Sequence, residues 1–186
     1  MREALKEYAI ANHVPIVREE SAEFLRRFCE KNKPNRILEI GTAIGYSGLI
    51  MLEACEASLV TIEINEERLN IAKDTLRGKK VEFILGDAYE EIQRLDGKFD
   101  LIFLDGPKSQ YIKYLPHLLR LLDKNGYILA DNILFNGLVE SDEYPTHKHR
   151  THILNMRKFL KTIKDDTRLN VELHKFADGM AVISWK

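Results

Sequence analysis

The sequence has 186 residues, of which 45% are hydrophobic and 31% are charged, and its formal net charge is −1. This composition is ordinary for a globular protein of one domain, and no apolar run approaches the roughly 20 residues that span a bilayer. The N-terminal stretch MREALKEYAI lacks the apolar core of a signal peptide, and the cysteines, Cys29 and Cys55, have no metal or redox spacing. We therefore expect one domain over residues 1–186, in the cytoplasm, with reduced thiols and no membrane contact.

Apolar, β-branched runs alternate with helical patterns along most of the chain. Helical spacing over 2–12 and 18–32 comes before the first strand. The predicted strands that follow are 36–41, 58–64, 80–86, 99–105 and 126–131. The helices predicted between them are 46–55, 65–76, 88–95 and 109–122. Near-continuous apolar strands joined by helices predict a parallel sheet with helices on both faces.

The pattern changes after residue 132. A helix is predicted at about 150–164, and two further strand-like runs, 169–176 and 180–186, are joined through Asp178 and Gly179, which form a strong hairpin signal. We therefore predict an α/β fold, a doubly wound Rossmann-like sheet of about seven strands. The sheet is mostly parallel, with a C-terminal antiparallel hairpin.

The ends of the first three strands indicate a nucleoside ligand. Gly41 in EIGTAIGYSG permits a tight turn. Glu63 lies 22 residues further on, where an acid can bind ribose hydroxyls. Asp87, after the third strand, could hold an exocyclic amine of a base. Each acid could instead be a solvated strand end. The turn lacks the fingerprint of a pyrophosphate ligand, which favours S-adenosylmethionine. The methionine carboxylate of this cofactor could lie at the helix N-terminus near Tyr46 and Ser47.

Acidic and amide side chains end the next two strands. Asp105 follows the fourth strand, and Asp131 and Asn132 follow the fifth, in the stretch LADNILFNGLV. Neighbouring strands lie about 4.8 Å apart, so these side chains should meet at one edge of the sheet. Two carboxylates so close repel unless a cation lies between them, and this all-oxygen set suits Mg²⁺ or Mn²⁺. The alternative is that Asp131 or Asn132 only caps a turn.

Lys108 lies three residues after Asp105 and could act as a general base, although a surface lysine in a first helical turn is common. A basic window from Tyr144 to Lys164 contains six Lys or Arg residues and no acid, which suits an anionic partner or a solvated helix face. His147, His149 and His152 could suggest zinc, but their mixed spacing favours a basic loop.

These motifs together resemble the class I, cation-dependent O-methyltransferases of the catechol and caffeoyl-CoA type. The resemblance runs from about His13 to the end of the chain. It places Ser47 on the methionine carboxylate and Glu63 on the ribose, and it adds a cofactor contact to Asp105. It assigns Asp87 and Ala88 to the adenine, and Lys108 and Tyr111 to the catalytic D-x-x-K-x-x-Y segment.

A closer resemblance is to the bacterial tRNA 5-hydroxyuridine methyltransferases. It is carried by EYAIANHVPI, GTAIGYS, DNILFNGLV and the basic HKHR. It implies methylation of the wobble uridine in the tRNA anticodon loop, with Lys148, His149 and Arg150 on the RNA, Val17 near the cofactor and a homodimer. The alternatives are O-methylation of a small catechol-like molecule and a non-catalytic nucleotide-binding module.

Overall fold

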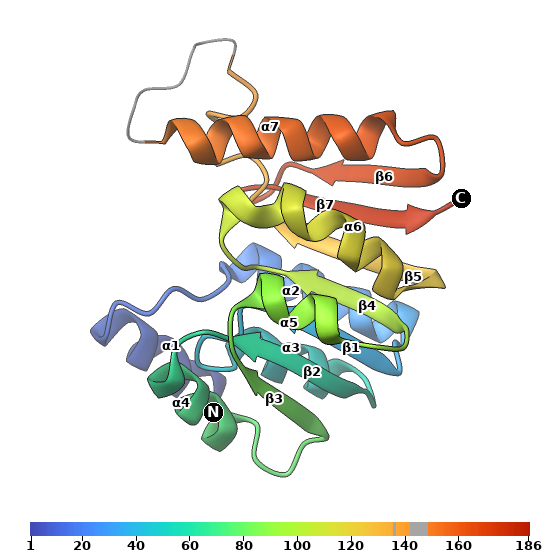
Figure 1. Ribbon diagram of the computed structural model, residues 1–186. Coiled ribbons are helices and arrows are strands. Elements are labelled where there is room, and N and C mark those ends of the chain that lie inside the picture. The colour runs from blue at the N-terminus through green and yellow to red at the C-terminus, as the bar shows by residue number, and fades with distance from the viewer. Residues whose placement is uncertain (136, 142–148) are drawn as a thin grey trace.

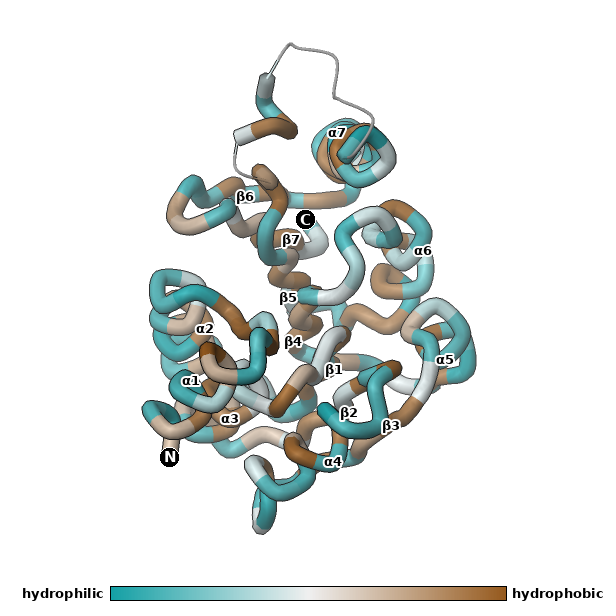
Figure 2. The backbone as a smooth tube through the Cα atoms, turned by 90° about the vertical axis from the view of Figure 1, so that its left-hand side faces the viewer, coloured by the Kyte–Doolittle hydropathy of each residue, from teal (hydrophilic) through white to brown (hydrophobic). Residues whose placement is uncertain are grey.

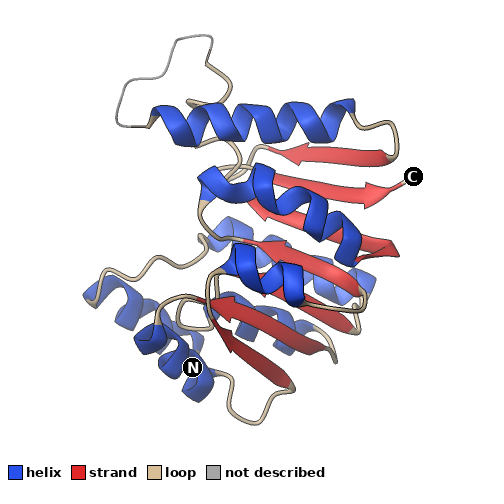
Figure 3. Cartoon of the chain, viewed as in Figure 1, coloured by secondary structure: helices blue, strands red, loops and turns tan. Residues whose placement is uncertain are grey.

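The computed structural model describes residues 1–135, 137–141 and 149–186 and shows a seven-stranded sheet between two layers of helices (Figures 1 and 3). The strands are β1 (Arg36–Ile40), β2 (Ser58–Glu63), β3 (Val81–Leu85), β4 (Phe99–Leu104), β5 (Leu122–Asp131), β6 (Leu169–His174) and β7 (Met180–Trp185). Their order in the sheet is β3-β2-β1-β4-β5-β7-β6. The first five pair in parallel, whereas β7 pairs antiparallel with both β5 and β6. The predicted fold class is confirmed.

Two apolar clusters, one on each face of the sheet, form the core. The helices are α1 (Arg2–Ala11), α2 (Glu19–Asn32), α3 (Tyr46–Ala54), α4 (Glu66–Thr75), α5 (Ala88–Arg94), α6 (Tyr111–Leu121) and α7 (Arg150–Asp165), with a short 3-10 helix, η1 (Lys108–Gln110). Side chains of α2 and α3 pack on one face, and those of α5, α6 and α7 pack on the other. Figure 2 shows this layering along the edge of the sheet. Strands covered on both faces are apolar almost throughout, as the sequence pattern required.

The fifth strand begins earlier than its sequence pattern predicts. Leu122 already pairs with Phe99, and the register then shifts before Leu101 meets Tyr127. The residues between are polar, so no apolar run marks this part of the strand. Gly126 lies where a Cβ atom would come within 2.8 Å of the Phe99 carbonyl oxygen. The bulge therefore needs a residue without a side chain at this position.

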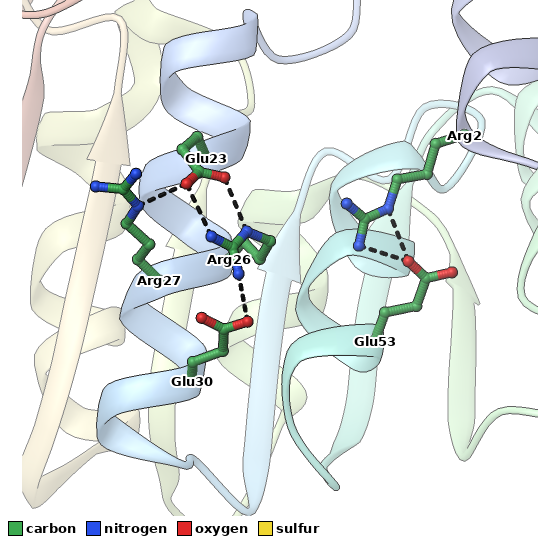
Figure 4. Close-up of polar contacts among 6 residues, drawn as sticks. All are labelled: Arg2, Glu23, Arg26, Arg27, Glu30 and Glu53. Atoms are coloured by element: carbon green, nitrogen blue, oxygen red, sulfur yellow. Dashed lines mark hydrogen bonds and ion pairs between the residues drawn. The ribbon is translucent and has the colours of Figure 1, made fainter.

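Ion pairs lie on the surface of the N-terminal helices. Arg2 of α1 contacts Glu53 of α3 at 2.5 Å, and within α2 Glu23 accepts from Arg26 and Arg27 (Figure 4). All of these side chains are substantially exposed, so solvent screening leaves each pair with little effect on stability. The position of α2 is therefore set by its buried face, which includes Ser21, Leu25 and Cys29.

Within the described ranges, none of the helices combines the length and the apolar character that crossing a membrane requires.

The close approach at Gly126 gives a first test. We expect Gly126→Ala to lower the free energy of unfolding by about 1–3 kcal/mol, because its methyl group would overlap the β4 backbone. Urea denaturation measures the change, with Lys124→Ala, at an exposed position of the same strand, as the control. An unchanged stability in Gly126→Ala would contradict the close approach.

Candidate active site

A cavity of about 510 Å³ lies where the parallel strands end at their carboxyl edge. Loops after β1 to β5 and the segment before α2 line it. Eight residues that the sequence singled out share this wall: Val17, Gly41, Glu63, Asp87, Ala88, Asp105, Lys108 and Asn132. Their common location follows from the parallel topology, which brings all the strand ends to one side.

The loop after β1 passes very close to the end of β4. Gly41 has φ +100°, and a Cβ atom there would lie 2.5 Å from the carbonyl oxygen of Asp105. No other residue type could take this conformation so near a neighbouring backbone. The glycine therefore allows the loop after β1 to pack directly against Asp105 at the end of the neighbouring strand β4.

Both acids of the predicted nucleoside site also have backbone partners. Glu63 accepts from the amide nitrogens of Ala43 at 2.8 Å and Asn65 at 2.9 Å, so its carboxylate is held against the loop after β1. Asp87 accepts from Tyr89 N at 2.8 Å and caps α5. These contacts hold both carboxylates at the cavity wall. Their predicted ligand roles stay predictions.

Ser47 is buried beneath the cavity wall and is not part of it. Its hydroxyl donates to Glu39 Oε1 at 2.5 Å, and Thr61 Oγ1 donates to the other carboxylate oxygen at 2.7 Å. Glu39 is fully buried in β1, and burial raises its pKa to about 7. Our sequence reasoning did not single out Glu39, although an acid inside the apolar run RILEI was a visible signal. In this structure, the Ser47 hydroxyl therefore binds Glu39, and its role at the methionine carboxylate stays a prediction.

Asp131 carries a buried carboxylate with one oxygen satisfied and one not. Oδ1 accepts from Ser21 Oγ at 3.1 Å and from Asn132 N at 2.9 Å. Oδ2 is buried and has no hydrogen-bond partner within the described part of the chain. Burial, and secondarily the charge of Asp105, raises the pKa of Asp131 to about 6. Asn132 then turns with φ +56°, a left-handed conformation that asparagine tolerates better than most residues.

The predicted base, Lys108, lies beside Asp105. Its ammonium group forms an ion pair with Asp105 Oδ1, and both side chains are about four-fifths buried, with 22% and 20% of their surface exposed. Lys108 opens η1, which places it at the cavity rim. The ammonium group of Lys108 thus contacts Asp105, the carboxylate that the sequence analysis predicted as a metal ligand.

Tyr111 is buried and binds the backbone of two neighbouring strands. It is fully buried, and its hydroxyl donates to the carbonyl oxygens of Leu104 at 2.9 Å and Asp131 at 3.2 Å. It therefore joins the ends of β4 and β5 below the cavity floor. The resemblance placed Tyr111 in the catalytic segment, but the cavity lining does not include it.

Of the predicted RNA-binding residues, His149 and Arg150 lie at the start of α7. Lys148, like His147, is outside the described residues. His149 packs its ring 5.3 Å from that of Phe135, and Arg150 is exposed in the first turn. Further along α7, Arg157 donates to the carbonyl oxygens of Leu138 and Val139, so part of the basic window supports local structure.

The donor chemistry fits a hard divalent cation. Asp105 and Asp131 supply carboxylate oxygens, Asn132 supplies an amide oxygen, and the unpartnered Oδ2 is the acceptor that a cation would satisfy. Across residues 1–135, 137–141 and 149–186, no three His, Cys, Asp or Glu side chains group as possible metal ligands. The candidate site therefore depends on two carboxylates and one amide, with the remaining positions left to water or substrate.

The Rossmann-like fold is shared with solved methyltransferases. A Podospora anserina methyltransferase, PaMTH1, solved with bound SAH, superposes with a TM-score of 0.82 at 30% identity over 92% of this chain and 80% of its own. A Bacillus cereus O-methyltransferase, 23% identical, shares the fold with a TM-score of 0.87 over 100% of this chain and 90% of its own.

The sequence comparison gives the family. The family model described as O-methyltransferase matches residues 1–186, and the chain belongs to this family. O-methyltransferase ankF of Aspergillus thermomutatus is 32% identical over 83% of this chain and 72% of its own length. Catechol O-methyltransferase of Mycobacterium tuberculosis is 29% identical over 67% of this chain and 60% of its own.

The raised pKa of Asp131 predicts a pH-dependent loss of stability. Its folded pKa of about 6 exceeds the ordinary value of 3.8, so the folded state holds the proton more tightly and stability falls as pH rises between these values. Asp131→Asn removes this loss. We expect the variant to be more stable than wild type at pH 8 by up to about 3 kcal/mol, with the difference vanishing near pH 3.

Urea denaturation in chelator-containing buffer at both pH values measures the effect. Asp74→Asn, at an exposed carboxylate paired with Arg77, is the control and should show little change. A less stable Asp131→Asn at pH 8 would contradict the unfavourable burial of this charge.

Proposed function

We propose that the chain transfers a methyl group from S-adenosylmethionine, and that the carboxyl-edge cavity holds this donor. Support comes from the cavity wall, which unites the glycine turn with Glu63 and Asp87. It also comes from PaMTH1, which binds the demethylated product of the same donor. Glu63 would accept hydrogen bonds from the ribose, and Asp87 with Ala88 would contact the adenine. Bound S-adenosylmethionine supplies an electrophilic methyl group on a sulfonium sulfur.

We further propose that the reaction requires Mg²⁺ or Mn²⁺, held by Asp105, Asp131 and Asn132. The observation that carries this proposal is the buried, unpartnered Oδ2 of Asp131, because leaving such an acceptor unsatisfied costs about 1–3 kcal/mol unless a ligand satisfies it. A divalent cation would lower the pKa of an acceptor hydroxyl and orient it. Acceptors with two adjacent oxygens suit such a site.

The residues around this site have separate tasks in the transfer. Lys108 Nζ, on the cavity wall, would accept the proton of the acceptor hydroxyl from its neutral form, after its own ammonium proton has passed from the ion pair with Asp105 to solvent. Gly41 brings the donor loop within contact of the Asp105 backbone, so donor and acceptor share one enclosed space. Tyr111 keeps the ends of β4 and β5 together, which holds the two carboxylates at a constant separation. Such positioning supplies much of the rate of a methyl transfer.

A small catechol-like molecule is the acceptor that the comparisons favour. The relatives include a catechol O-methyltransferase and several caffeoyl-CoA O-methyltransferases, among them that of Petroselinum crispum, at 27% identity over 88% of this chain and 73% of its own. The two adjacent hydroxyl oxygens of a catechol could both bind the cation that this site is proposed to hold.

The 5-hydroxyl of 5-hydroxyuridine at the tRNA wobble position is the second candidate acceptor, giving 5-methoxyuridine. Its hydroxyl lies beside a carbonyl oxygen, so it offers the same pair of oxygens. The observation that favours it is the charge of α7, which carries five Lys or Arg residues and no acid from Arg150 to Lys164. A cytoplasmic location and a homodimer belong to this proposal as well.

Removal of one predicted ligand tests the metal dependence. We expect Asp131→Ala to lower methyl transfer by at least about 100-fold, since the metal contributes several kcal/mol to the transition state. The assay follows labelled methyl groups from S-adenosylmethionine into a catechol or into unmethylated tRNA, with Mg²⁺ or with chelator. Asp96→Ala, exposed before β4 at the opposite edge of the sheet, is the matched control. Full turnover in chelator would refute the cation site.

The same assay separates the two acceptors. Methylated catechol without RNA supports the small-molecule reaction, whereas a new methoxyuridine in digested tRNA, detected by mass spectrometry, supports the RNA reaction. If tRNA is the acceptor, its affinity should fall steeply with salt, and Arg150→Gln should reduce the logarithmic salt slope by about 1. A salt-independent affinity would remove tRNA from consideration.

A further inference from the structure

Ser21 is a buried polar residue to which neither the cavity lining nor the sequence motifs assign a role. It lies in the first turn of α2 and is 0% exposed. Its hydroxyl donates to Asp131 Oδ1 at 3.1 Å, although the two residues are 110 positions apart. A serine inside a helix commonly returns its hydroxyl to a carbonyl of the preceding turn. Ser21 instead reaches across the layer boundary to the carboxylate at the end of β5.

The two oxygens of Asp131 have different environments because of this contact. Oδ1 receives two donors, the hydroxyl of Ser21 and the backbone amide of Asn132, whereas Oδ2 receives none from the described residues. The Asn132 amide belongs to the adjoining residue and moves with it. Ser21 belongs to another layer, so it can fix the rotation of the carboxylate relative to the rest of the domain.

The backbone of Asp131 does not need this support. It pairs with Met180 in the sheet, and its carbonyl oxygen accepts from the hydroxyl of Tyr111 at 3.2 Å. The Ser21 contact therefore acts on the side chain alone. It determines which oxygen is occupied by the protein and which is left for a ligand.

We propose that Ser21 is a positioning residue for the cation site: it holds Oδ1 of Asp131 and so presents Oδ2 to the divalent cation. This inference rests on the proposed function, because it needs that cation. Residues 15–18, directly before α2, line the cavity. Ser21 thus links the cavity wall to the ligand set through one helical turn. Partners of metal ligands typically change metal affinity by about 10–100-fold when they are removed.

The test measures Mn²⁺ binding by electron paramagnetic resonance on the whole protein at pH 8, without donor or acceptor. We expect Ser21→Ala to weaken binding by about 10-fold or more. Ser21→Thr keeps the hydroxyl and should recover most of the affinity. Ser58→Ala is the matched control, because it removes a hydroxyl that donates to the carbonyl oxygen of Asn35 at 3.2 Å, far from the cavity. Asp131→Ala should abolish binding.

Two failures can be told apart. Wild-type affinity in Ser21→Ala, together with lost binding in Asp131→Ala, would overturn the role of Ser21 and leave the cation site intact. Absence of Mn²⁺ binding in the wild type would overturn the cation site and this inference with it. Thermal unfolding without metal gives a further criterion, since a lowered melting temperature with unchanged Mn²⁺ affinity would make Ser21 a structural residue only.

Discussion

The buried carboxylate of Asp131 is the constraint on which the site depends. A charge at this depth is unfavourable unless it is compensated, and the raised pKa of Asp131 expresses that penalty. Three elements meet at this residue. The first turn of α2 provides Ser21, α6 provides Tyr111 to the backbone, and β7 pairs with the strand end. The surrounding core therefore holds an acid with one oxygen left unsatisfied.

A second buried acid, Glu39, has a hydrogen-bond donor at each of its carboxylate oxygens. Glu39 lies in the adjoining part of the sheet, and hydroxyl groups of Ser47 and Thr61 donate to its two oxygens. Its carboxylate is satisfied by the protein alone, whereas Oδ2 of Asp131 has no partner among the described residues. Both carboxyl groups have raised pKa values despite this difference. Hydrogen-bond satisfaction therefore distinguishes these two acids, whereas burial alone does not.

Asp105 contacts two other parts of the cavity wall. Its backbone lies against Gly41, and its side chain pairs with Lys108. A substitution at Gly41 or at Lys108 would therefore alter the surroundings of Asp105. This arrangement is consistent with an O-methyltransferase, in which donor and acceptor must meet within one enclosed volume. The described residues of α7 carry positive charge but do not line the cavity.

The sequence by itself determined the element order, the parallel core with its antiparallel end, and part of the cavity wall. These features follow from local signals: apolar periodicity marks strands and helices, and parallel connections bring all the strand ends to one edge. Asp105, Asp131 and Asn132 could be singled out because polar residues that close apolar strands are locally conspicuous, and their role as metal ligands stays a prediction. Only the tertiary structure decided that Ser21 holds Asp131, that Ser47 faces Glu39, and that β5 begins at a bulge. These depend on how helices pack on the sheet and on register between strands, which residues distant in the chain establish together and no local pattern records.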